Sequence, residues 1–483
     1  MKIDTFKKEH LDYQHARAEY WDHVHSEPRQ KWSDYYRQKL QSAYAQVISP
    51  GATILELGCG RGDLLAALQP SVGVGIDCSA IAIELAQQSH PALTFHVFDA
   101  HQLDSSTQAL GDRTFDYIII SELVNDLWDV QRVLTGLKRF CAPHTRIVCN
   151  FYSHAWNVPL SIGQALGIAT PRLTQNWLAP NDMSNLLSIS GLQPLRAWSE
   201  VLLPIKIPFV SEFCNRYLAK LLPFRLLDMA NFTIARPMPE VVAPPPSASV
   251  VVAARNESGH IDELLARIPD MGSRTELIFV EGHSTDDTYA AIERAIAEHP
   301  DRHCKLIRQP GKGKGDAVRA GFEIATGDIL MILDADITVP PEDLPRFYDL
   351  LASGEGEFIN GVRLVYPMEG NAMRFANLLG NKFFSWAFSW LLGQPIRDTL
   401  CGTKVLWRKD YKRIEKNRAY FGDFDPFGDF DLLFGAAKLN LKLLEVPIRY
   451  RARRYGETNI SRWKHGWLLL RMVAFAARRI KFV

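Results

Sequence analysis

Short, mainly apolar runs recur along both halves of the chain, and each run ends at glycines or acidic residues. The first half has such runs at residues 53–57 and 72–76, and the second half has them at residues 249–254 and 329–333. Apolar runs of this length without polar alternation are typical of parallel strands that are buried on both faces. Each half also opens on a strand, a turn and a helix, so the pattern predicts an α/β fold in each half.

One proline-rich stretch divides the chain almost in half. Five prolines fall within the twelve residues 236–247, and proline fits neither the interior of a helix nor a central strand. We therefore predict an N-terminal domain over residues 1–238, a linker over 239–247 and a C-terminal domain over 248–483. With 483 residues, of which 47% are hydrophobic, the chain is long enough for more than one core.

Composition excludes several classes of protein. The 55 Lys and Arg residues balance 54 Asp and Glu residues, so no global positive field is available to hold nucleic acid. Aromatic residues make up 11% of the chain, which argues against disorder. The seven cysteines form no CxxC pair, so we expect neither a disulfide framework nor a zinc ribbon, and a reducing cytoplasm fits best. The N-terminus has no apolar segment, so we expect no secretory signal.

Glycines and acids in the first half indicate a nucleoside site. Gly58, Gly60 and Gly62 follow the strand at 53–57, and glycines at such a turn let the backbone approach a ligand. Asp77 ends the second strand, where a ribose diol is usually held, and Asp99 ends the third in the same way.

The GxGxG spacing and the charge of Glu56 favour a cofactor with a cationic amino-acid end over an anionic diphosphate. Residues 35–238 resemble the class I S-adenosylmethionine-dependent methyltransferases, with a Rossmann-like sheet. The resemblance implies that the glycine turn carries the methionine part, that the strand-two acid holds the ribose, and that the third acid lies near the adenine. The cofactor-binding residues that it implies are Glu56, Gly58, Gly60, Gly62, Asp77 and Asp99.

The methyl acceptor and any general base stay open at this point. The methyltransferase family often has a histidine shortly after strand four, whereas this chain has Asp126 there. Glycine turns also serve other nucleotides, so the alternative is a different nucleotide or a domain that has lost its activity.

Acids also collect at strand ends in the second half. Glu257 and Glu281 follow the first two strands, and Asp334 and Asp336 follow the third. Two carboxylates one residue apart at a strand end suit Mg²⁺ or Mn²⁺, which completes its coordination with substrate phosphates. Such a metal offsets the charge that builds up on a diphosphate leaving group.

Residues 248–460 resemble the family-2, GT-A-fold glycosyltransferases, and in particular the dolichol-phosphate mannosyltransferase and polyprenyl-phosphate glycosyltransferase branch. Six pieces carry the resemblance in order, at residues 253–257, 311–321, 334–336, 398–404, 445–448 and 453–458. The resemblance implies an inverting, metal-dependent transfer from a nucleoside diphosphate sugar to a polyprenyl phosphate or a lipid-linked saccharide. The chain departs from the family's usual residues at Ala253, at Glu281-Gly282 and at Asn459. The nucleotide base and the sugar of the donor therefore stay open.

The same resemblance assigns site residues. It implies that the nucleotide sugar meets Glu257, Glu281, Lys314 and Asp334, and that the metal meets Asp334 and Asp336. It implies that acceptor or phosphate groups meet Arg363, Arg374, Asp398 and Arg453. Asp429 and Asp431 fall where relatives that act on hydroxyls place their base. A hydroxyl acceptor needs such a base, whereas a phosphate acceptor is already anionic, and both possibilities stay open.

Two aromatic and basic segments, 373–392 and 462–471, suit the headgroup zone of a membrane. The chain from 447 to 483 holds ten Lys or Arg residues against one acid, Glu457, so an anionic lipid surface would attract it. The alternative is that these aromatics fill a core or a dimer interface. No apolar run approaches the length of a membrane span, so we expect a cytoplasmic protein, peripheral at the inner face of the membrane.

Together these patterns predict a bifunctional enzyme that transfers a sugar and also methylates a related glycan or lipid with S-adenosylmethionine. The alternative is a glycosyltransferase that acts on a hydroxyl and carries an inactive, cofactor-binding methyltransferase-like scaffold.

Overall fold

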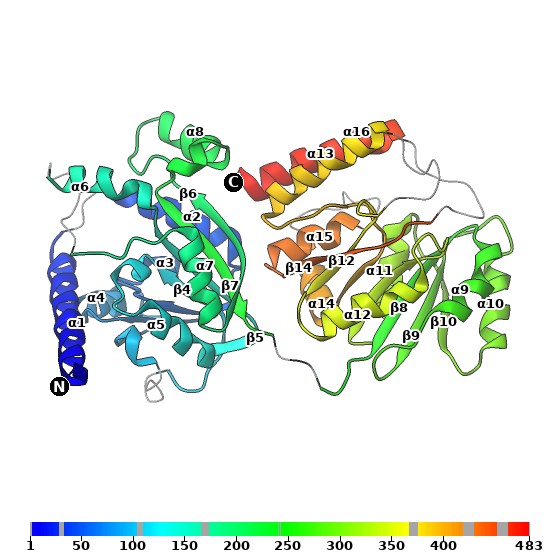
Figure 1. Ribbon diagram of the computed structural model, residues 1–483, viewed down its shortest axis with the longest axis horizontal. Coiled ribbons are helices and arrows are strands. Elements are labelled where there is room, and N and C mark those ends of the chain that lie inside the picture. Colours follow the sequence, from blue (N-terminus) through cyan, green and yellow to red (C-terminus); the bar gives the residue numbers. More distant parts are fainter. Residues whose placement is uncertain are drawn as a thin grey trace. The chain divides into compact units, whose positions relative to one another are not determined.

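The computed structural model describes most of the chain as two compact units. Unit 1 comprises residues 1–238 with 481–483, and unit 2 comprises residues 239–480. The described residues are 2–28, 33–103, 110–165, 173–239, 241, 243–366, 375–418, 429–451 and 462–482. Each unit is built on one sheet with helices on both faces, as Figure 1 shows.

Unit 1 holds a seven-stranded sheet in the order β3-β2-β1-β4-β5-β7-β6. Its strands are β1 (Thr53–Leu57), β2 (Val72–Asp77), β3 (Thr94–Val97), β4 (Phe115–Ser121), β5 (Cys141–Tyr152), β6 (Leu192–Glu200) and β7 (Ala230–Pro237). The first five strands pair in parallel, and β7 joins β5 and β6 in antiparallel pairs. The α/β fold expected for this half is confirmed.

Both faces of this sheet are buried, which explains the continuous apolar runs. Leu55 and Ile118 pack toward α5 (Val130–Gly136) and α7 (Pro180–Ile189). Their neighbours Ile54 and Ile119 belong to the opposite core. That core also contains residues of α2 (Ser33–Val47), α3 (Asp63–Ala67) and α4 (Ala80–Ser89). Successive strand residues point to opposite faces, so a strand between two helical layers needs apolar residues at nearly every position.

Among the described residues, unit 1 also contains three further α-helices. The long helix α1 (Lys2–Ser26) packs against α4. The other two are α6 (Asn157–Ala165) and α8 (Val210–Arg216), which lies between β6 and β7 in the sequence.

Unit 2 holds a second seven-stranded sheet, in the order β10-β9-β8-β11-β13-β12-β14. Its strands are β8 (Ala248–Ala254), β9 (Thr275–Glu281), β10 (His303–Arg308), β11 (Ile329–Asp334), β12 (Phe358–Val362), β13 (Lys404–Trp407) and β14 (Leu443–Pro447). Strands β8 to β11 pair in parallel, and β13 is antiparallel to both β11 and β12. The predicted α/β fold of the second half is likewise confirmed.

Two helical layers cover the sheet of unit 2. One core includes residues of α9 (Ile261–Arg267), α10 (Thr288–Glu298) and α12 (Leu344–Ala352). The opposite core includes residues of α11 (Lys314–Ile324), α13 (Phe375–Leu392), α14 (Arg408–Lys416), α15 (Asp429–Lys438) and α16 (Arg462–Ala476).

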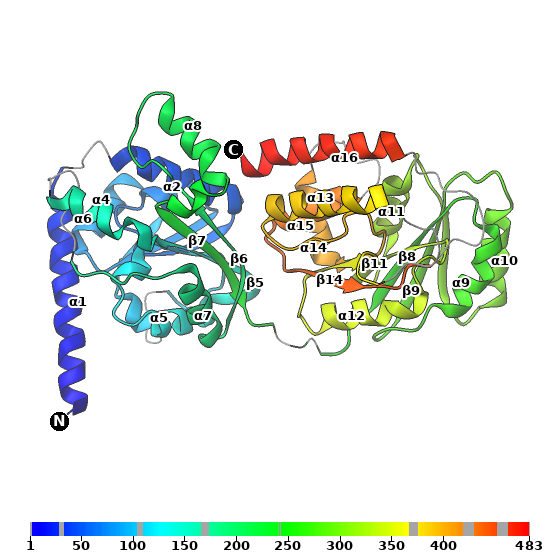
Figure 2. The ribbon, with the colours of Figure 1, turned by 45° about the horizontal axis from the view of Figure 1, so that its top comes forward.

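Helices α13 and α16 run side by side, as Figures 1 and 2 both show. Phe388 and Met472 belong to the core, whereas Trp386 and Trp467 are each 67% exposed. The aromatic segments therefore divide between the core and the surface of unit 2. Among the described helices, none combines the length and the apolar character that crossing a bilayer requires.

Candidate functional site

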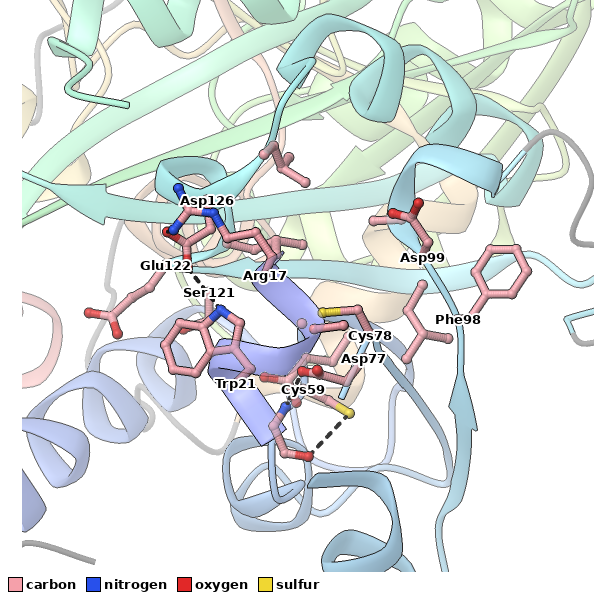
Figure 3. Close-up of a pocket in the computed structure, with 18 of the residues that line it drawn as sticks. Arg17, Trp21, Cys59, Asp77, Cys78, Phe98, Asp99, Ser121, Glu122 and Asp126 are labelled. Carbon is pink, nitrogen blue, oxygen red and sulfur yellow. Dashed lines mark hydrogen bonds and ion pairs between the residues drawn. The ribbon is translucent and has the colours of Figure 1, made fainter. Parts of the chain in front are cut away.

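A cavity of about 610 Å³ opens at the carboxyl ends of β1, β2 and β4 in unit 1. It lies where the glycine turn, Asp77 and Asp99 meet, and residues of α1 form another wall (Figure 3). Parallel α/β sheets bind ligands at this edge, where the strand order reverses. The cavity is large enough for a nucleoside cofactor, since small-molecule pockets usually measure about 300–1,000 Å³.

The glycine turn depends on backbone conformations that other residues rarely adopt. Gly58, Gly60 and Gly62 have φ angles of 70°, 50° and 75°. A Cβ atom at Gly62 would lie 2.6 Å from the ring of Phe95. The backbone N–H of Gly60 donates a hydrogen bond to Asp77 Oδ2 over 2.8 Å, so the turn is fastened to the tip of β2.

Two carboxyl groups, the buried Glu56 and the half-buried Asp77, line this cavity. Glu56 is 2% exposed, and its Oε2 atom has no hydrogen-bond partner. Burial and the charge of Asp77 raise the pKa of Glu56 well above its ordinary value. Burial also raises the pKa of Asp77, although hydrogen bonds from the N–H groups of Ser79 and Gly60 oppose that rise. A cationic group bound nearby would favour the ionised forms of both carboxyl groups.

Asp99 lies at the far end of the same cavity and is held by its neighbours. Its Oδ1 atom accepts the N–H of His101 over 3.0 Å and contacts His101 Nδ1 at 2.8 Å, while Gln14 of α1 donates to Oδ2. Burial alone would raise the pKa of Asp99, but the His101 hydrogen bonds outweigh it and hold the pKa below its ordinary value.

Helix α1 supplies part of the cavity wall, although no motif within its residues indicates this. Arg17 Nη1 forms an ion pair with Asp126 Oδ1 at 3.2 Å, and both side chains are at least nine-tenths buried. Trp21 Nε1 donates to Asp126 Oδ2 over 3.1 Å, and Gln175 Nε2 donates to Oδ1 over 3.2 Å. Asp126 therefore fastens α1 over the cavity (Figure 3).

Glu122 is a second wall residue that sequence reasoning missed. It follows β4 with a φ of 58°, in a region that L-residues seldom adopt. Its Oε1 atom accepts a hydrogen bond from Tyr36 OH over 2.5 Å. Such strain is retained where the surrounding structure fixes a side chain in place, as often happens at functional sites.

In unit 2, the sheet register brings the predicted acids to one edge. Asp334 of β11 pairs with Ala253 of β8, and Ala253 pairs with Val280 of β9. The chain leaves all three strands within a residue or two of these positions. Glu281 and Asp334 are therefore the last residues of strands that end side by side with β8, and Glu257 follows β8.

Lys314 and Asp334 form an ion pair at this edge, between Nζ and Oδ1. Gly402, just before β13, packs directly against this pair. A Cβ atom at Gly402 would overlap both Asp334 Oδ2 and Lys314 Nζ. The motif at 398–404 thus contributes its backbone to the site, and only glycine leaves room for the ion pair.

Three cations surround the carboxylate of Asp334. Burial would raise its pKa, but the charges of Lys314, Lys404 and Arg363 outweigh burial and hold the pKa below its ordinary value. Lys404 is fully buried, and its Nζ atom donates to the carbonyl of Cys401 over 2.5 Å. Lys404 ends the motif at residues 398–404, but the motif alone did not predict a role for its side chain.

Asp336 lies two residues beyond Asp334 and is fixed by its own turn. Its Oδ1 atom accepts the hydroxyl of Thr338 over 2.7 Å and the N–H of Thr338 over 3.2 Å. The residue between, Ile337, has a φ of 53°, a strained value for a β-branched side chain.

The described residues contain no group of three or more His, Cys, Asp or Glu side chains placed to hold a metal ion. Asp334 and Asp336 offer two carboxylates, which are hard oxygen ligands. Mg²⁺ in nucleotide sites typically takes one or two carboxylates and fills its other positions with water and phosphate oxygens. Asp334 and Asp336 supply that number of carboxylates, and Asp334 is paired with Lys314 in this structure.

Arg363 and Asp398 form a two-pronged ion pair. Arg363 Nε lies 2.7 Å from Asp398 Oδ2, and Nη2 lies 2.9 Å from Oδ1. The Arg363 guanidinium also lies over the Tyr450 ring, 5.3 Å from its centroid. The charge of Arg363 keeps the pKa of Asp398 below its ordinary value, although burial opposes this. Asp398 thus orients Arg363 and fixes one edge of its guanidinium.

Glu257 and Glu281 are buried and have internal partners. Glu257 Oε2 lies 2.9 Å from His260 Nδ1, and Glu281 Oε1 accepts the N–H of Ser284 over 2.5 Å. Both carboxyl groups therefore help to shape the loops after β8 and β9.

The remaining predicted residues lie at or beyond the limits of the described structure. Arg374, Arg453 and the side chain of Asp429 are outside the described residues. Asp431 of α15 is paired with Arg418, with Nε and Oδ2 2.7 Å apart.

Unit 2 has a cavity of about 480 Å³ beside the loop that follows Asp336. Arg346, Arg449 and Arg451 contribute to its lining, together with the acids Glu342 and Asp343. The N–H of Arg451 donates to the Thr338 carbonyl over 3.0 Å, which connects this cavity with the Asp336 turn. Part of the positive charge counted in the C-terminal sequence is therefore placed near the strand-end acids.

Two family models match this chain, one in each unit. The family described as glycosyl transferase family 2 matches residues 249–434, and the family described as methyltransferase domain matches residues 48–177. These matches cover the strand-end acids of unit 2 and the glycine turn of unit 1.

Curated relatives match a little under half of the chain. A dolichyl-phosphate hexose transferase of Haloferax volcanii is 30% identical over 45% of this chain and 88% of its own length. Glycosyltransferase AglJ of the same organism is 29% identical over 47% of this chain and 70% of its own. A dolichol-phosphate mannosyltransferase of Pyrococcus furiosus is 32% identical over 44% of this chain and 59% of its own. The chain belongs to glycosyltransferase family 2, and it carries a methyltransferase domain ahead of the glycosyltransferase domain.

Proposed function

We propose that the chain is a bifunctional transferase. Unit 2 transfers a sugar from a nucleoside diphosphate sugar, with inversion, to a polyprenyl phosphate at the cytoplasmic face of a membrane. Unit 1 methylates a related glycan or lipid with S-adenosylmethionine. The observation that carries the first proposal is the Lys314–Asp334 ion pair beneath Gly402, which lies at the sheet edge where nucleotide sugars bind in α/β folds.

Cations at the site of unit 2 support an anionic donor and an anionic acceptor. Lys314, Lys404 and Arg363 surround Asp334, and together they suit a diphosphate. Asp334 and Asp336 would hold Mg²⁺ or Mn²⁺, which would offset negative charge on the leaving diphosphate. Lys314 would take part in the same task, since its ammonium group lies against the Asp334 carboxylate.

Two observations support a phosphate acceptor, namely the names of the relatives and the positive charge near the site. Relatives named above act on dolichyl phosphate, and a phosphate monoester needs positioning by cations rather than deprotonation. Arg449 and Arg451 in the cavity beside the Asp336 turn provide such cations. A hydroxyl acceptor with Asp429 as the base is the competing function, and it predicts that Asp429→Asn abolishes transfer.

The test is transfer of a radiolabelled sugar to polyprenyl phosphate by the full chain. Wild-type protein should move the label into the lipid phase in the presence of Mg²⁺ or Mn²⁺. Asp429→Asn should retain most of that activity, since a phosphate acceptor carries no proton for Asp429 to remove. Transfer only to hydroxyl acceptors, lost in Asp429→Asn, would replace this proposal with its competitor.

S-adenosylmethionine is proposed for unit 1 because of the charges in its cavity. The cofactor has a cationic ammonium group and a sulfonium, and the cavity offers Glu56 with an unpartnered Oε2 atom beside Asp77. The residues present fit the cofactor. Glu56 would face its amino-acid end, Asp77 its ribose and Asp99 its adenine.

An inactive scaffold that only binds the cofactor is the second candidate for unit 1. Calorimetric titration with S-adenosylmethionine tests binding, and transfer of a labelled methyl group to a membrane glycolipid extract tests activity. Binding with no methyl transfer to any fraction of that extract would favour the scaffold. No binding at all would remove both forms of the proposal.

Contact with a membrane surface is also proposed for unit 2. Phe383 and Trp386 of α13 and Trp467 and Leu470 of α16 are 42–67% exposed. Exposed aromatics near basic residues suit the headgroup region of a bilayer. Flotation with anionic vesicles tests this, and a Trp386→Glu/Trp467→Glu variant should float less than wild type.

A further inference from the structure

The connection between β6 and β7 of unit 1 carries many exposed apolar side chains. It spans residues 201–229 and includes α8 and the short turns η5 (Leu218–Lys220) and η6 (Phe224–Leu227). Eleven of its apolar side chains are at least 39% exposed, namely Ile205, Ile207, Phe209, Val210, Phe213, Tyr217, Leu221, Leu222, Phe224, Leu226 and Leu227. We call these residues the apolar platform. A contiguous exposed apolar surface usually marks an interaction site.

Polar side chains of the same connection point inward and fasten its backbone. Ser211 is 1% exposed, and its hydroxyl donates to the Ile205 carbonyl over 2.7 Å and accepts the Ile207 N–H over 2.8 Å. Asn215 is 5% exposed and bonds both the N–H and the carbonyl of Leu203, at 2.9 and 2.8 Å. The usual distribution of a surface loop is thus reversed, with polar groups inside and apolar groups outside.

The platform is also anchored to the body of unit 1. Glu212 forms an ion pair with Lys39 of α2 at 2.6 Å. Asn215 Nδ2 donates to Tyr35 OH of α2 over 3.2 Å, and Trp156 Nε1 donates to the Leu227 carbonyl over 2.7 Å. These bonds fix the connection at its middle and near its C-terminal end, so its apolar side chains are presented on a supported surface.

Phe209 shows that the outward orientation is imposed on the chain. Its φ is 63°, a strained value for a bulky residue, and it is 93% exposed. Nothing in the core gains from this strain, because the ring is the most exposed of the platform. Strain of this kind persists where function requires a side chain in a particular place.

Charge complementarity indicates which partner the platform fits. The exposed charged residues within residues 202–227 are Lys206, Arg216, Arg225 and Glu212. Because Glu212 is neutralised by Lys39, the three basic residues leave the surface positive. Apolar side chains interspersed with Lys and Arg suit an anionic bilayer, where the apolar groups enter the headgroup boundary and the cations meet lipid phosphates.

We propose that the apolar platform docks unit 1 on an anionic lipid bilayer. This surface belongs to the methyltransferase unit, and it is separate from the aromatic residues of α13 and α16 in unit 2. The inference does not depend on either catalytic proposal, because it concerns only where unit 1 binds. Taken together with the proposed methylation by unit 1, it places the methyl acceptor at the membrane surface.

Hydrogen–deuterium exchange of the full-length wild-type chain tests the proposal. Vesicles of phosphatidylcholine with phosphatidylglycerol should slow amide exchange within residues 205–227, and vesicles of phosphatidylcholine alone should slow it less. Because exchange is read segment by segment, protection here is distinguished from protection of α13 and α16. Unchanged exchange in 205–227 with anionic vesicles would overturn the proposal. Protection that grows with protein concentration without vesicles would also overturn it, since a second copy would then cover the platform.

A pair of variants provides a second test of the proposal, through binding to vesicles. Phe209→Glu/Leu222→Glu/Leu226→Glu places three acids on the platform and should lower the vesicle partition coefficient of the full chain about tenfold or more. The control Val72→Glu/Ile189→Glu/Val241→Glu changes exposed apolar residues elsewhere, at 43%, 53% and 77% exposure, and should bind as wild type does. Equal binding by the two variants would contradict the proposal.

Discussion

Gly60 donates its backbone N–H to Asp77 Oδ2 over 2.8 Å, which joins the glycine turn to the tip of β2. The same carboxylate accepts the N–H of Ser79 at the start of the next helix, over 2.9 Å. Asp77 therefore shapes the cavity of unit 1 as well as lining it. Replacing the carboxylate by an amide separates these two roles. The amide oxygen can still accept a hydrogen bond from the turn, but the negative charge that faces the cavity is lost.

Asp77→Asn should weaken binding of S-adenosylmethionine, and Asp77→Ala should weaken it further. Asn keeps one oxygen for Gly60 but cannot accept at both positions, so we expect a loss of about ten- to a hundredfold, as for one or two charge-assisted bonds. Calorimetric titration of the full chain measures the affinity. Asp112→Asn is the matched control, because its side chain is 85% exposed and lies outside the residues that line the cavity. Equal affinity in Asp77→Ala and wild type would contradict the proposal that S-adenosylmethionine binds in this cavity.

Asp228 should make unit 1 less stable as the pH rises. Both of its carboxylate oxygens are buried without a partner, and burial with the charge of Glu200 raises its pKa to about 8. A carboxyl whose folded pKa exceeds its unfolded value near 4 contributes stability that is fully present below pH 4. That contribution is lost as the pH rises through about 8.

Asp228→Asn removes this titration, so its melting temperature should exceed that of wild type at pH 8.5 by more than at pH 5. Thermal unfolding followed by circular dichroism from pH 5 to pH 9 measures the difference. Parallel pH profiles for the two proteins would show that Asp228 does not titrate in this range.

Lys314→Met should abolish sugar transfer while leaving the fold intact. Without Lys314, the Asp334 carboxylate loses its closest cation, and the diphosphate loses an ammonium group. We expect kcat/KM to fall by about a hundredfold or more, as for removal of a preorganised charged group. Lys312→Met is the control, since Lys312 is exposed in the same loop and also stands between glycines. A similar fall in both variants would mean that the loop, rather than the Lys314–Asp334 pair, matters.

Gly402→Ala should also lower sugar transfer, in this case through a steric clash. A methyl group there would overlap Asp334 Oδ2 and Lys314 Nζ, so the ion pair must separate. Gly380→Ala in α13 is the control, because a methyl group at Gly380 meets nothing within 4 Å. Transfer assays on both variants, with circular dichroism to verify folding, make the comparison. Full activity in Gly402→Ala would show that the site tolerates separation of the pair.

The fold was predictable because the strands carry a strong local signal. Val250, Val251 and Val252 alternate between the two cores of unit 2, so every position must be apolar. The acids that follow such strands are predictable for a related reason, since the ends of neighbouring parallel strands meet at one edge.

Other features depend on contacts between distant parts of the chain. Arg17 meets Asp126 across 109 residues of sequence, and α1 as a whole is too polar to reveal from its own pattern which face is buried. Lys404 approaches Asp334 because β13 inserts antiparallel between β11 and β12, a pairing that no local motif indicates. The reversed polarity of the β6–β7 connection became visible only from the burial of Ser211 and Asn215.

Transfer of a labelled sugar to polyprenyl phosphate by wild type and by Asp336→Asn tests the central claim most directly. The account predicts metal-dependent labelling of the lipid by wild type, and little or none by Asp336→Asn. It also predicts equal affinity of the two proteins for S-adenosylmethionine, because Asp336 lies in unit 2 and the cofactor cavity in unit 1. Undiminished labelling by Asp336→Asn would contradict the account.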